Sequence, residues 1–344
     1  MKSLDLKPVG FGVVGLGMGS ARARQIKEES VKGLPVKLVS ICDIDEERGR
    51  EYCEKIGVPW TTDYRDLLTN PDIEAVYVVT ETGNHAQIAI DAMNAGKHVL
   101  STKPLEAGLK AGKAEVVAAE INGVKLAVDF DKRHTSEATQ RIRWAIERGL
   151  LGKILMADVS LKVLRTDEYF QERGGWRGTW AMDGGGAMSN QGIHELDALY
   201  WFLGMPDTVE AKIWTQNHAI EAEDLGIAVW NYKDGAVASL KCTTSWVPGE
   251  WYFRQEISGT KGAVVFDSQG NEKWFLNGKW QEYPPECNVD LTSATVRFAR
   301  AIRLGEPMPV DGQEGLRSLS ILKAMYESAK LKKPVSPEEL LEQT

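Results

Sequence analysis

The first 130 residues alternate short apolar runs with amphipathic segments of helical periodicity. The apolar runs are nearly continuous, as in parallel strands that are buried on both faces. These runs occupy residues 8–15, 36–43, 74–80, 97–101 and 125–129. The helical segments between them occupy residues 18–30, 45–57, 84–96 and 106–122. This order predicts a doubly wound α/β domain, in which helices cover both faces of a parallel sheet.

The pattern changes near residue 134, so we expect one domain over residues 1–133 and a second over residues 134–344. Strand-like runs occupy residues 153–165, 208–216, 225–232, 235–246, 251–259, 262–266 and 273–283. The turns between several of them are short, and Asn277-Gly278 is typical of a type I′ hairpin. Successive strands of this kind predict an α/β domain with a large, mostly antiparallel open sheet. Further helical segments lie at residues 136–152, 292–305 and 315–331.

A glycine-rich turn, GLGMGS, follows the first apolar run and opens the first helical segment. Gly15 permits the tight turn, and Gly17 lets the backbone approach a pyrophosphate at the positive end of the helix. Met18 lies within the same turn, and Ser20 is small enough for close packing of helix on strand. The position between strand and helix favours a Rossmann-type dinucleotide site, although a tight turn without a ligand would have the same letters.

Asp43 ends the second apolar run, 23 residues after Ser20. An acid at this position accepts hydrogen bonds from the ribose hydroxyls of NAD and repels the 2′-phosphate of NADP. No arginine follows it directly, so we expect NAD rather than NADP. The alternative is that Asp43 or Asp45 caps the helix beginning at Glu46, and Asp45 is the better placed for that.

Composition and charge exclude several classes of protein. The chain is 43% hydrophobic, and its formal charge of -8 with scattered lysines and arginines argues against nucleic-acid binding. No apolar run approaches the roughly 18 to 20 residues that span a bilayer, and the N-terminus lacks the pattern of a signal peptide. The four cysteines form no CxxC pair and no zinc signature occurs, so we expect reduced thiols, a cytoplasmic location and no metal.

Lys103 stands where the fourth apolar run ends, directly before Pro104. Ligands bind at the carboxyl ends of the strands in open parallel sheets. The residue before a proline is biased towards an extended conformation, which limits where Lys103 can point. A lysine is usually a solvated surface residue, but this position favours a role at the ligand site.

These motifs, with DYRDLLTNPDIEAVYVVT and AGKHVLSTKPLEAG, closely resemble the family of glucose–fructose oxidoreductase, inositol dehydrogenase and MocA. The resemblance implies that Lys103 works at the site of hydride transfer. Members carry Glu-Lys-Pro there, whereas this chain has Thr102. Members also have Thr-Pro and then a histidine after the preceding strand, and this chain keeps Thr80 and His85 without the proline. These departures touch residues that the resemblance places beside the cofactor.

The segment GGGAMSNQGIHELDALYWFLG contains a second candidate centre. Asn190, His194 and Asp197 are spaced to share one face of a helix, and glycines 184–186 would permit close approach to a ligand. Histidine moves protons near neutral pH, although a lone helix histidine is more often structural. By resemblance His194 is the general base, with Lys103 polarising the same oxygen. The family has an aspartate where this chain has Asn190, which can bind a substrate hydroxyl but carries no charge.

A long loop precedes this helix and is rich in glycine and tryptophan. Trp176 and Trp180 could stack on a sugar ring, and Arg177 could bind hydroxyls or a carboxylate; the family has a Trp-Arg pair near this place. For Trp246, Trp251 and Tyr252 packing within a sheet or interface is the better interpretation. The residues Lys132, Arg133 and His134 follow the last strand of the first domain, and Lys132 is a candidate for substrate binding. Packing at the domain junction explains them equally well.

Together these features predict an NAD-dependent oxidoreductase that acts on a sugar, a polyol or a sugar derivative. Two alternatives stay open. Some members of the family cleave glycosides by transient oxidation with bound NAD, and some bind the dinucleotide as sensors without catalysis. The resemblance also implies a homodimer or homotetramer, with C-terminal helices packing back towards the first domain.

Overall fold

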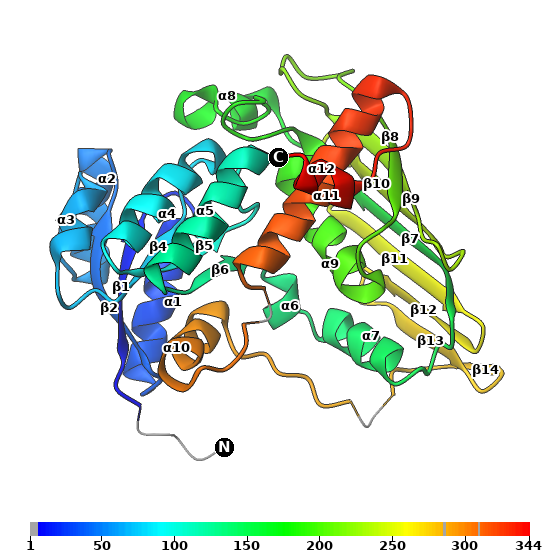
Figure 1. The fold of residues 1–344 in the computed structure, drawn as a ribbon, viewed down its shortest axis with the longest axis horizontal. Helices are drawn as coiled ribbons and strands as arrows, with labels where there is room; N and C mark the ends of the chain where they lie inside the picture. Colours follow the sequence, from blue (N-terminus) through cyan, green and yellow to red (C-terminus); the bar gives the residue numbers. More distant parts are fainter. Residues whose placement is uncertain (1–5, 285–286, 309) are drawn as a thin grey trace. The chain divides into compact units, whose positions relative to one another are not determined.

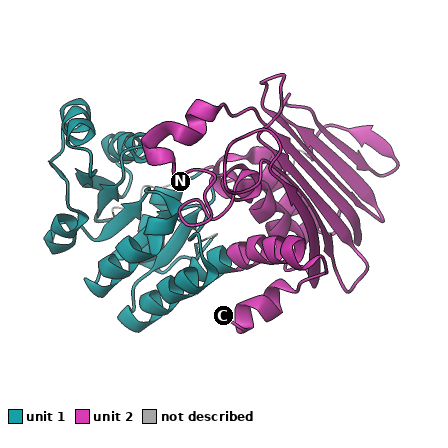
Figure 2. Cartoon of the chain, turned by 90° about the horizontal axis from the view of Figure 1, so that it is seen from above, with its two compact units in different colours: residues 1–130, 292–316 teal, residues 131–291, 317–344 magenta. Residues whose placement is uncertain are grey.

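The computed structural model describes residues 6–284, 287–308 and 310–344, which form two compact units. The first unit comprises residues 1–130 and 292–316, and the second comprises residues 131–291 and 317–344 (Figure 2). Among the described residues, no helix combines the length and apolarity that crossing a bilayer requires.

A six-stranded parallel sheet forms the centre of the first unit, in the order β3-β2-β1-β4-β5-β6 (Figure 1). Its strands are β1 (Val9–Val14), β2 (Val36–Cys42), β3 (Trp60–Thr61), β4 (Ala75–Val78), β5 (His98–Thr102) and β6 (Leu126–Asp129). Its helices are α1 (Gly19–Val31), α2 (Glu46–Ile56), α3 (Tyr64–Thr69), α4 (His85–Asn94), α5 (Leu109–Asn122) and α10 (Ala294–Leu304), with a short 3₁₀-helix at Thr82–Asn84. Every residue of β1, β4 and β6 is buried, as the continuous apolar runs predict. The predicted Rossmann-type fold is confirmed.

Residues from the far end of the chain complete this unit. Phe298 of α10 packs in the same core as Phe11, with ring centroids 6.5 Å apart. Arg303 pairs with Glu74 at 2.6 Å, and the amide of Val128 donates to the carbonyl of Val310 at 3.0 Å. The periodicity of residues 292–305 predicts a helix, but it does not indicate which unit the helix joins.

The second unit is built on an eight-stranded mixed sheet in the order β14-β13-β12-β11-β7-β10-β9-β8. Its strands are β7 (Ile154–Lys162), β8 (Thr208–Trp214), β9 (Leu225–Asn231), β10 (Val237–Thr243), β11 (Tyr252–Gly259), β12 (Gly262–Asp267), β13 (Glu272–Leu276) and β14 (Lys279–Gln281). Only β7 and β10 pair in parallel; the other pairs are antiparallel, which confirms the predicted sheet. Asn277 has a φ of 54° at the turn between β13 and β14, as a type I′ hairpin requires.

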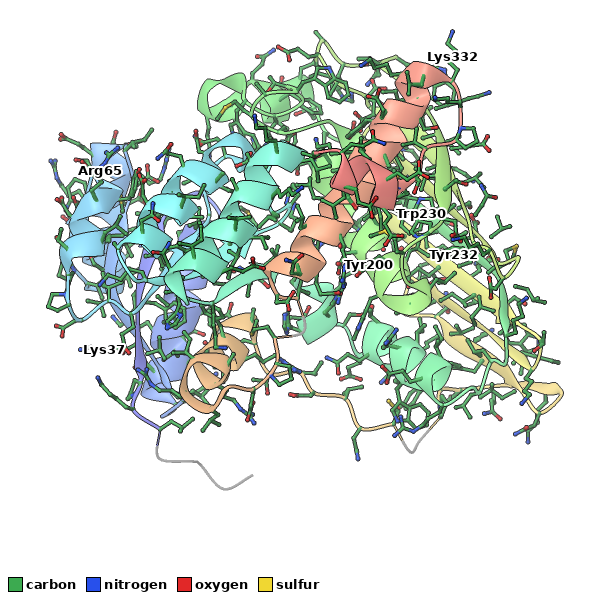
Figure 3. The ribbon with its side chains drawn as sticks, in the orientation of Figure 1. Lys37, Arg65, Tyr200, Trp230, Tyr232 and Lys332 are labelled. Atoms are coloured by element: carbon green, nitrogen blue, oxygen red, sulfur yellow. The ribbon has the colours of Figure 1, made fainter. Side chains whose placement is uncertain are left out.

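One face of this sheet is buried and the other is open. Residues along β9, β10 and β11 alternate between buried and more exposed positions. The buried ring of Trp230 on β9 and that of Tyr200 on α9 belong to the core of this unit (Figure 3). The helices of this unit are α6 (Lys132–Thr135), α7 (Glu137–Glu147), α8 (Asp167–Gly175), α9 (Ile193–Leu203) and α12 (Pro337–Glu342), while α11 (Gly312–Leu331) begins within the first unit. The loop expected before α9 thus contains a short helix, α8, which is kinked at residues 172–174.

Three consecutive residues at the start of α6 pair with residues of α9, and we call these contacts the α6–α9 ladder. Asp131 lies 3.1 Å from His194, Lys132 pairs with Glu195, and Arg133 pairs with Asp197 at 2.7 Å. The Arg133 guanidinium donates to both carboxylate oxygens of Asp197, and both side chains are only 1% exposed. The hydroxyl of Ser318 on α11 donates to the same carboxylate at 2.8 Å. This buried, bidentate pair holds α6 against α9 in one register.

Removing one partner of this pair is expected to destabilise the second unit strongly. In R133M the Asp197 carboxylate stays buried without its counter-charge, so we expect a loss of about 3–5 kcal/mol in the free energy of unfolding. The double variant R133M/D197L removes both charges and should lose less. Urea unfolding monitored by tryptophan fluorescence measures the difference. A loss below about 1 kcal/mol in R133M would contradict the importance given to this pair.

Candidate functional site

Residues predicted to hold the cofactor gather at one edge of the six-stranded sheet. Gly15 and Gly17 follow β1, Asp43 follows β2, Thr80 follows β4, and Lys103 follows β5. Because these strands are parallel neighbours, their carboxyl ends lie along the same edge (Figure 1). This edge is where ligands bind in folds of this type.

The glycine turn fits a dinucleotide. Gly15 has a φ of 88°, and a Cβ added to it would lie 2.5 Å from the carbonyl oxygen of Val79. Helix α1 begins after Met18, which is 73% exposed, and no side chain caps the amides of its first turn. Uncapped amides at a helix N-terminus bind phosphate groups. The hydroxyl of Ser20 donates to the carbonyl of Gly17 at 3.1 Å and so closes the turn.

Asp43 joins the glycine turn to the start of α2. One carboxylate oxygen accepts from the amide of Leu16 at 2.7 Å, and the other accepts from the amide of Asp45 at 2.9 Å. Arg48 donates to both oxygens as well, at 3.0 and 3.1 Å, so ribose hydroxyls would have to replace or share the Arg48 contacts. Asp45 caps α2 by accepting from the amide of Arg48, so the capping role expected of it is confirmed.

Arg48 is a residue that the sequence argument for NAD overlooked. Its guanidinium folds back from α2 and lies 3.0 Å from Asp43 and 3.0 Å from Asp45. Its position five residues after Asp43 is the signal that could have found it. Two carboxylates outweigh one guanidinium, so the local charge still opposes a 2′-phosphate.

His85 is wholly buried and ties the Lys103 loop to the end of β4. Its Nδ1 lies 3.2 Å from the carbonyl oxygen of Pro104, and its Nε2 lies 3.2 Å from that of Thr80. Burial lowers the pKa of His85, and the nearby Glu106 opposes this shift. Lys103 and Thr102 are half-buried, and the Lys103–Pro104 peptide is cis. The loop that carries Lys103 is therefore held by backbone contacts on either side of the His85 ring.

His194 stands at the start of α9, beside a carboxylate that sequence reasoning missed. Its Nδ1 lies 3.1 Å from Oδ1 of Asp131, and the two side chains are 21% and 41% exposed. Asp131 is 63 residues away along the chain, so no local spacing connects them. The only available signal was its place two residues before Arg133, within a run of charged residues.

Asn190 belongs to a π-helix, Ala187–Gln191, rather than to α9 itself. Asn190, His194 and Asp197 thus do not form the regular helical face that we expected. The amide nitrogen of Asn190 donates to Oδ1 of the buried Asp183 at 2.8 Å. A carboxylate at position 190 would face that of Asp183, and this repulsion explains why an amide stands here. The hydroxyl of Tyr169 lies 3.4 Å from Oδ1 of Asn190.

The glycines before the π-helix approach protein groups, not the open ligand space that we expected. A Cβ on Gly185 would lie 2.0 Å from the hydroxyl of Tyr326, and one on Gly186 would lie 1.9 Å from the carbonyl oxygen of Glu223. The Glu223 carboxylate accepts from the amides of Gly186 and Met188 and from the hydroxyl of Tyr326, at 2.8–3.0 Å. Burial raises the pKa of Glu223 to about 7. This single side chain clamps the segment that leads to His194.

The remaining predicted substrate residues occupy two places in the second unit. Arg177 donates to the carbonyl of Tyr169 at 2.8 Å and stacks over the Tyr169 ring, 4.3 Å from its centroid. The guanidinium carbon of Arg177 lies 5.3 Å from the centroid of the Trp176 ring. Lys132 pairs with Glu195 and lies 3.9 Å from the centroid of the Phe253 ring, so its charge serves the ladder. Within the described part of the chain, no three His, Cys, Asp or Glu side chains form a metal-binding group.

Comparison with known families follows the two units. Residues 9–130 match the sequence model of an oxidoreductase family with an NAD-binding Rossmann fold, GFO/IDH/MocA. Residues 139–265 match the C-terminal domain of the same family. Together the two matches cover most of the chain.

Named relatives align over nearly the whole length. The chain is 28% identical to 1,5-anhydro-D-fructose reductase of Ensifer adhaerens, over 93% of this chain and 96% of the relative. It is 25% identical to myo-inositol 2-dehydrogenase of Thermotoga maritima, over 96% of this chain and 99% of the relative. Among solved structures, the WlbA dehydrogenase of Bordetella pertussis in complex with NADH and UDP-GlcNAcA is similar, with a TM-score of 0.85 and 29% identity over 96% of this chain and 98% of that chain.

The Glu223 clamp predicts a pH dependence of stability. The ordinary pKa of this carboxyl is 4.5 and the folded value is about 7, so between these values only the folded state keeps the proton. Stability should therefore fall as pH rises from 4.5 to 7, by about 3 kcal/mol from this group. Unfolding midpoints measured across this range should show the decrease in the wild type and a flatter curve in E223Q. The exposed E210Q on β8 is the matched control, and an E223Q curve parallel to the wild type would refute the assignment.

Proposed function

The chain belongs to the GFO/IDH/MocA family of NAD-binding oxidoreductases, and we propose that it transfers a hydride between the nicotinamide and a CH–OH carbon of a sugar, polyol or sugar derivative. The observation that carries this proposal is the 3.1 Å approach of Asp131 to Nδ1 of His194. An imidazole with a carboxylate beside it can serve as the base for a hydroxyl group. The relatives named as an inositol dehydrogenase and a sugar reductase support the class of substrate.

In the oxidative direction His194 takes the proton of the substrate hydroxyl through Nε2. Lys103 places its ammonium at the same oxygen and stabilises the alkoxide that develops there. The bound nicotinamide supplies the acceptor for the hydride that leaves the carbon. The products are a carbonyl compound, NADH and one proton. In the reverse direction His194 returns the proton to the oxygen.

The chain's own residues also account for cofactor choice and orientation. Gly15, Gly17 and the first turn of α1 hold the pyrophosphate, and Asp43 holds the ribose of NAD. Met18, Thr80 and Thr102 lie along the same strand ends. His85 acts through the backbone of Thr80 and Pro104, because its ring is wholly buried.

Asp131 supplies the carboxylate that the family places four residues before the histidine. Position 190 holds an asparagine that donates to Asp183, so a charge at that point would be repelled. Asp131 approaches the imidazole from α6 instead, and stabilises the protonated ring that forms during oxidation. Asn190 is left to bind a substrate hydroxyl, with Trp176 and Arg177 further along the same surface.

We further propose that the open face of the eight-stranded sheet forms a homodimer or homotetramer. Met156, Val229 and Val237 are each 38–47% exposed on this face of the sheet. Exposed apolar groups gathered on one sheet favour association with a second copy. The four cysteines are free thiols. We also propose a cytoplasmic location, as expected from the sequence.

The catalytic pair can be tested with two variants and a panel of substrates. H194A and K103M should each lower kcat/KM by about 10²- to 10⁴-fold, because each removes a group that acts on the reacting oxygen. NADH formation from a panel of polyols and sugars, and NADH consumption with the matching ketoses, measures activity. NADH binding followed by fluorescence should stay within about threefold in H194A. Tight NADH binding without turnover of any substrate by the wild type would instead favour a sensor.

Asp131 is tested by separating kcat from KM rather than by a single rate. D131N keeps an acceptor near Nδ1 but loses the charge, so kcat for oxidation should fall about 10- to 100-fold. KM and the affinity for NADH should stay within about threefold, because Asp131 acts on the imidazole and not on binding. D131E should restore part of the loss in kcat, and D72N, an exposed change in the first unit, should leave kcat and KM unchanged. An unchanged kcat in D131N, or a loss confined to KM, would refute this role.

A further inference from the structure

We propose that Arg165 is the anion-binding residue of a substrate subsite, so that this protein takes sugars bearing a carboxylate, sulfate or phosphate group. The inference rests on the proposed function, because the subsite adjoins Asn190 through Tyr169. The inference concerns which sugars bind, not how the hydride moves. Its residues differ from the proposed catalytic pair, and binding rather than turnover measures it.

Arg165 has a rigid backbone between β7 and α8. Its amide donates to the carbonyl of Thr244 at 2.9 Å, and its carbonyl accepts from Nε2 of His218 at 2.8 Å. His218 is itself buried and lies 3.3 Å from the carboxylate of Asp224. These contacts fix the direction in which the Arg165 side chain leaves the chain.

The side chain lies between two aromatic rings. Its guanidinium carbon is 4.8 Å from the centroid of Tyr169 and 5.8 Å from that of Trp251. Contacts of this kind hold an arginine in place without neutralising its charge. The side chain is therefore positioned before any ligand arrives.

The charge of Arg165 lacks a carboxylate partner. Within residues 6–284, 287–308 and 310–344, no Asp or Glu oxygen lies within 4.0 Å of its nitrogens, and its buried Nε has no acceptor. A buried donor without an acceptor is costly, and guanidinium stays charged at any relevant pH. Acidic residues outnumber basic ones by 49 to 41 in the chain, so the missing partner is not explained by a shortage of carboxylates. A ligand anion would supply the missing counter-charge.

The surroundings connect this arginine to the proposed substrate residues. The guanidinium carbon of Arg177 lies 4.3 Å from the centroid of the same Tyr169 ring. The nearest carboxylate oxygen of Glu172 lies 3.6 Å from the Arg177 guanidinium. The Tyr169 hydroxyl accepts from Gln191 at 3.0 Å and lies 3.4 Å from Asn190. Trp251 is 51% exposed and offers an aromatic face beside the guanidinium. An anionic substituent at Arg165 would thus belong to a sugar whose hydroxyls reach Asn190.

The direct test compares one neutral and one acidic sugar in the NADH-loaded protein. Calorimetry with D-glucose and D-glucuronate should show tighter binding of glucuronate by the wild type. R165Q should weaken glucuronate about 10- to 100-fold and glucose less than about threefold, because the lost interaction is charge-assisted. The affinity of R165K for glucuronate should lie between those of the wild type and R165Q, since lysine keeps the charge but loses the planar fork. R148Q, which changes another ring-stacked arginine, over Trp144 on α7, is the matched control and should leave both affinities unchanged.

D-Glucose 6-sulfate and D-glucose 6-phosphate identify which anion the subsite prefers. An Arg165-dependent gain with any of the three acids supports the proposal. It is overturned if the wild type binds none of them more tightly than glucose, or if R165Q weakens glucose and the acids equally, as a purely structural role would. Binding is measured without turnover. Arg165-dependent affinity in a protein that transfers no hydride would therefore refute the proposed function and leave the anion subsite standing.

Discussion

The buried pair between Arg133 and Asp197 is the interaction on which the second unit's site depends. It holds α6 against α9 in one register, with both side chains removed from water. Because Asp131, Lys132 and Arg133 are consecutive, fixing the last of them also directs the first towards His194. A pair that contributes little net stability can still select one arrangement of two helices, and that selection is its role here.

Electrostatic repulsion near Asp183 explains why position 190 holds an asparagine rather than the aspartate of the family pattern. Asn190 donates to the buried Asp183, and Glu223 clamps the backbone just before it. Three acidic groups would crowd this segment if position 190 carried a carboxylate. Placing the negative charge on α6 instead separates it from Asp183 and Glu223, and it still reaches Nδ1 of His194. Under the proposed function, the departure is therefore a relocation of charge.

The first unit shows how far periodicity reaches. The strands, the glycine turn, Asp43 and Lys103 were all predictable, because each depends on neighbours along the chain and on the shared edge of a parallel sheet. Arg48 and the His85 ring were harder to interpret. Their partners are chosen by how α2 and the Lys103 loop fold back, and residue spacing alone does not distinguish a cofactor contact from a backbone tie.

By itself the sequence determined the two sheets, the strand ends at which the expected cofactor residues stand, and which lysine and histidine to propose for catalysis. These features follow from local patterns of burial and turn formation, which act over a few residues. Only the tertiary structure decided which charges meet: Asp131 with His194, Asn190 with Asp183, and Arg165 with aromatic rings and no acid among the described residues. Such pairings depend on distances between segments far apart in the chain, and a charged side chain looks the same in the sequence whether it meets a partner or not.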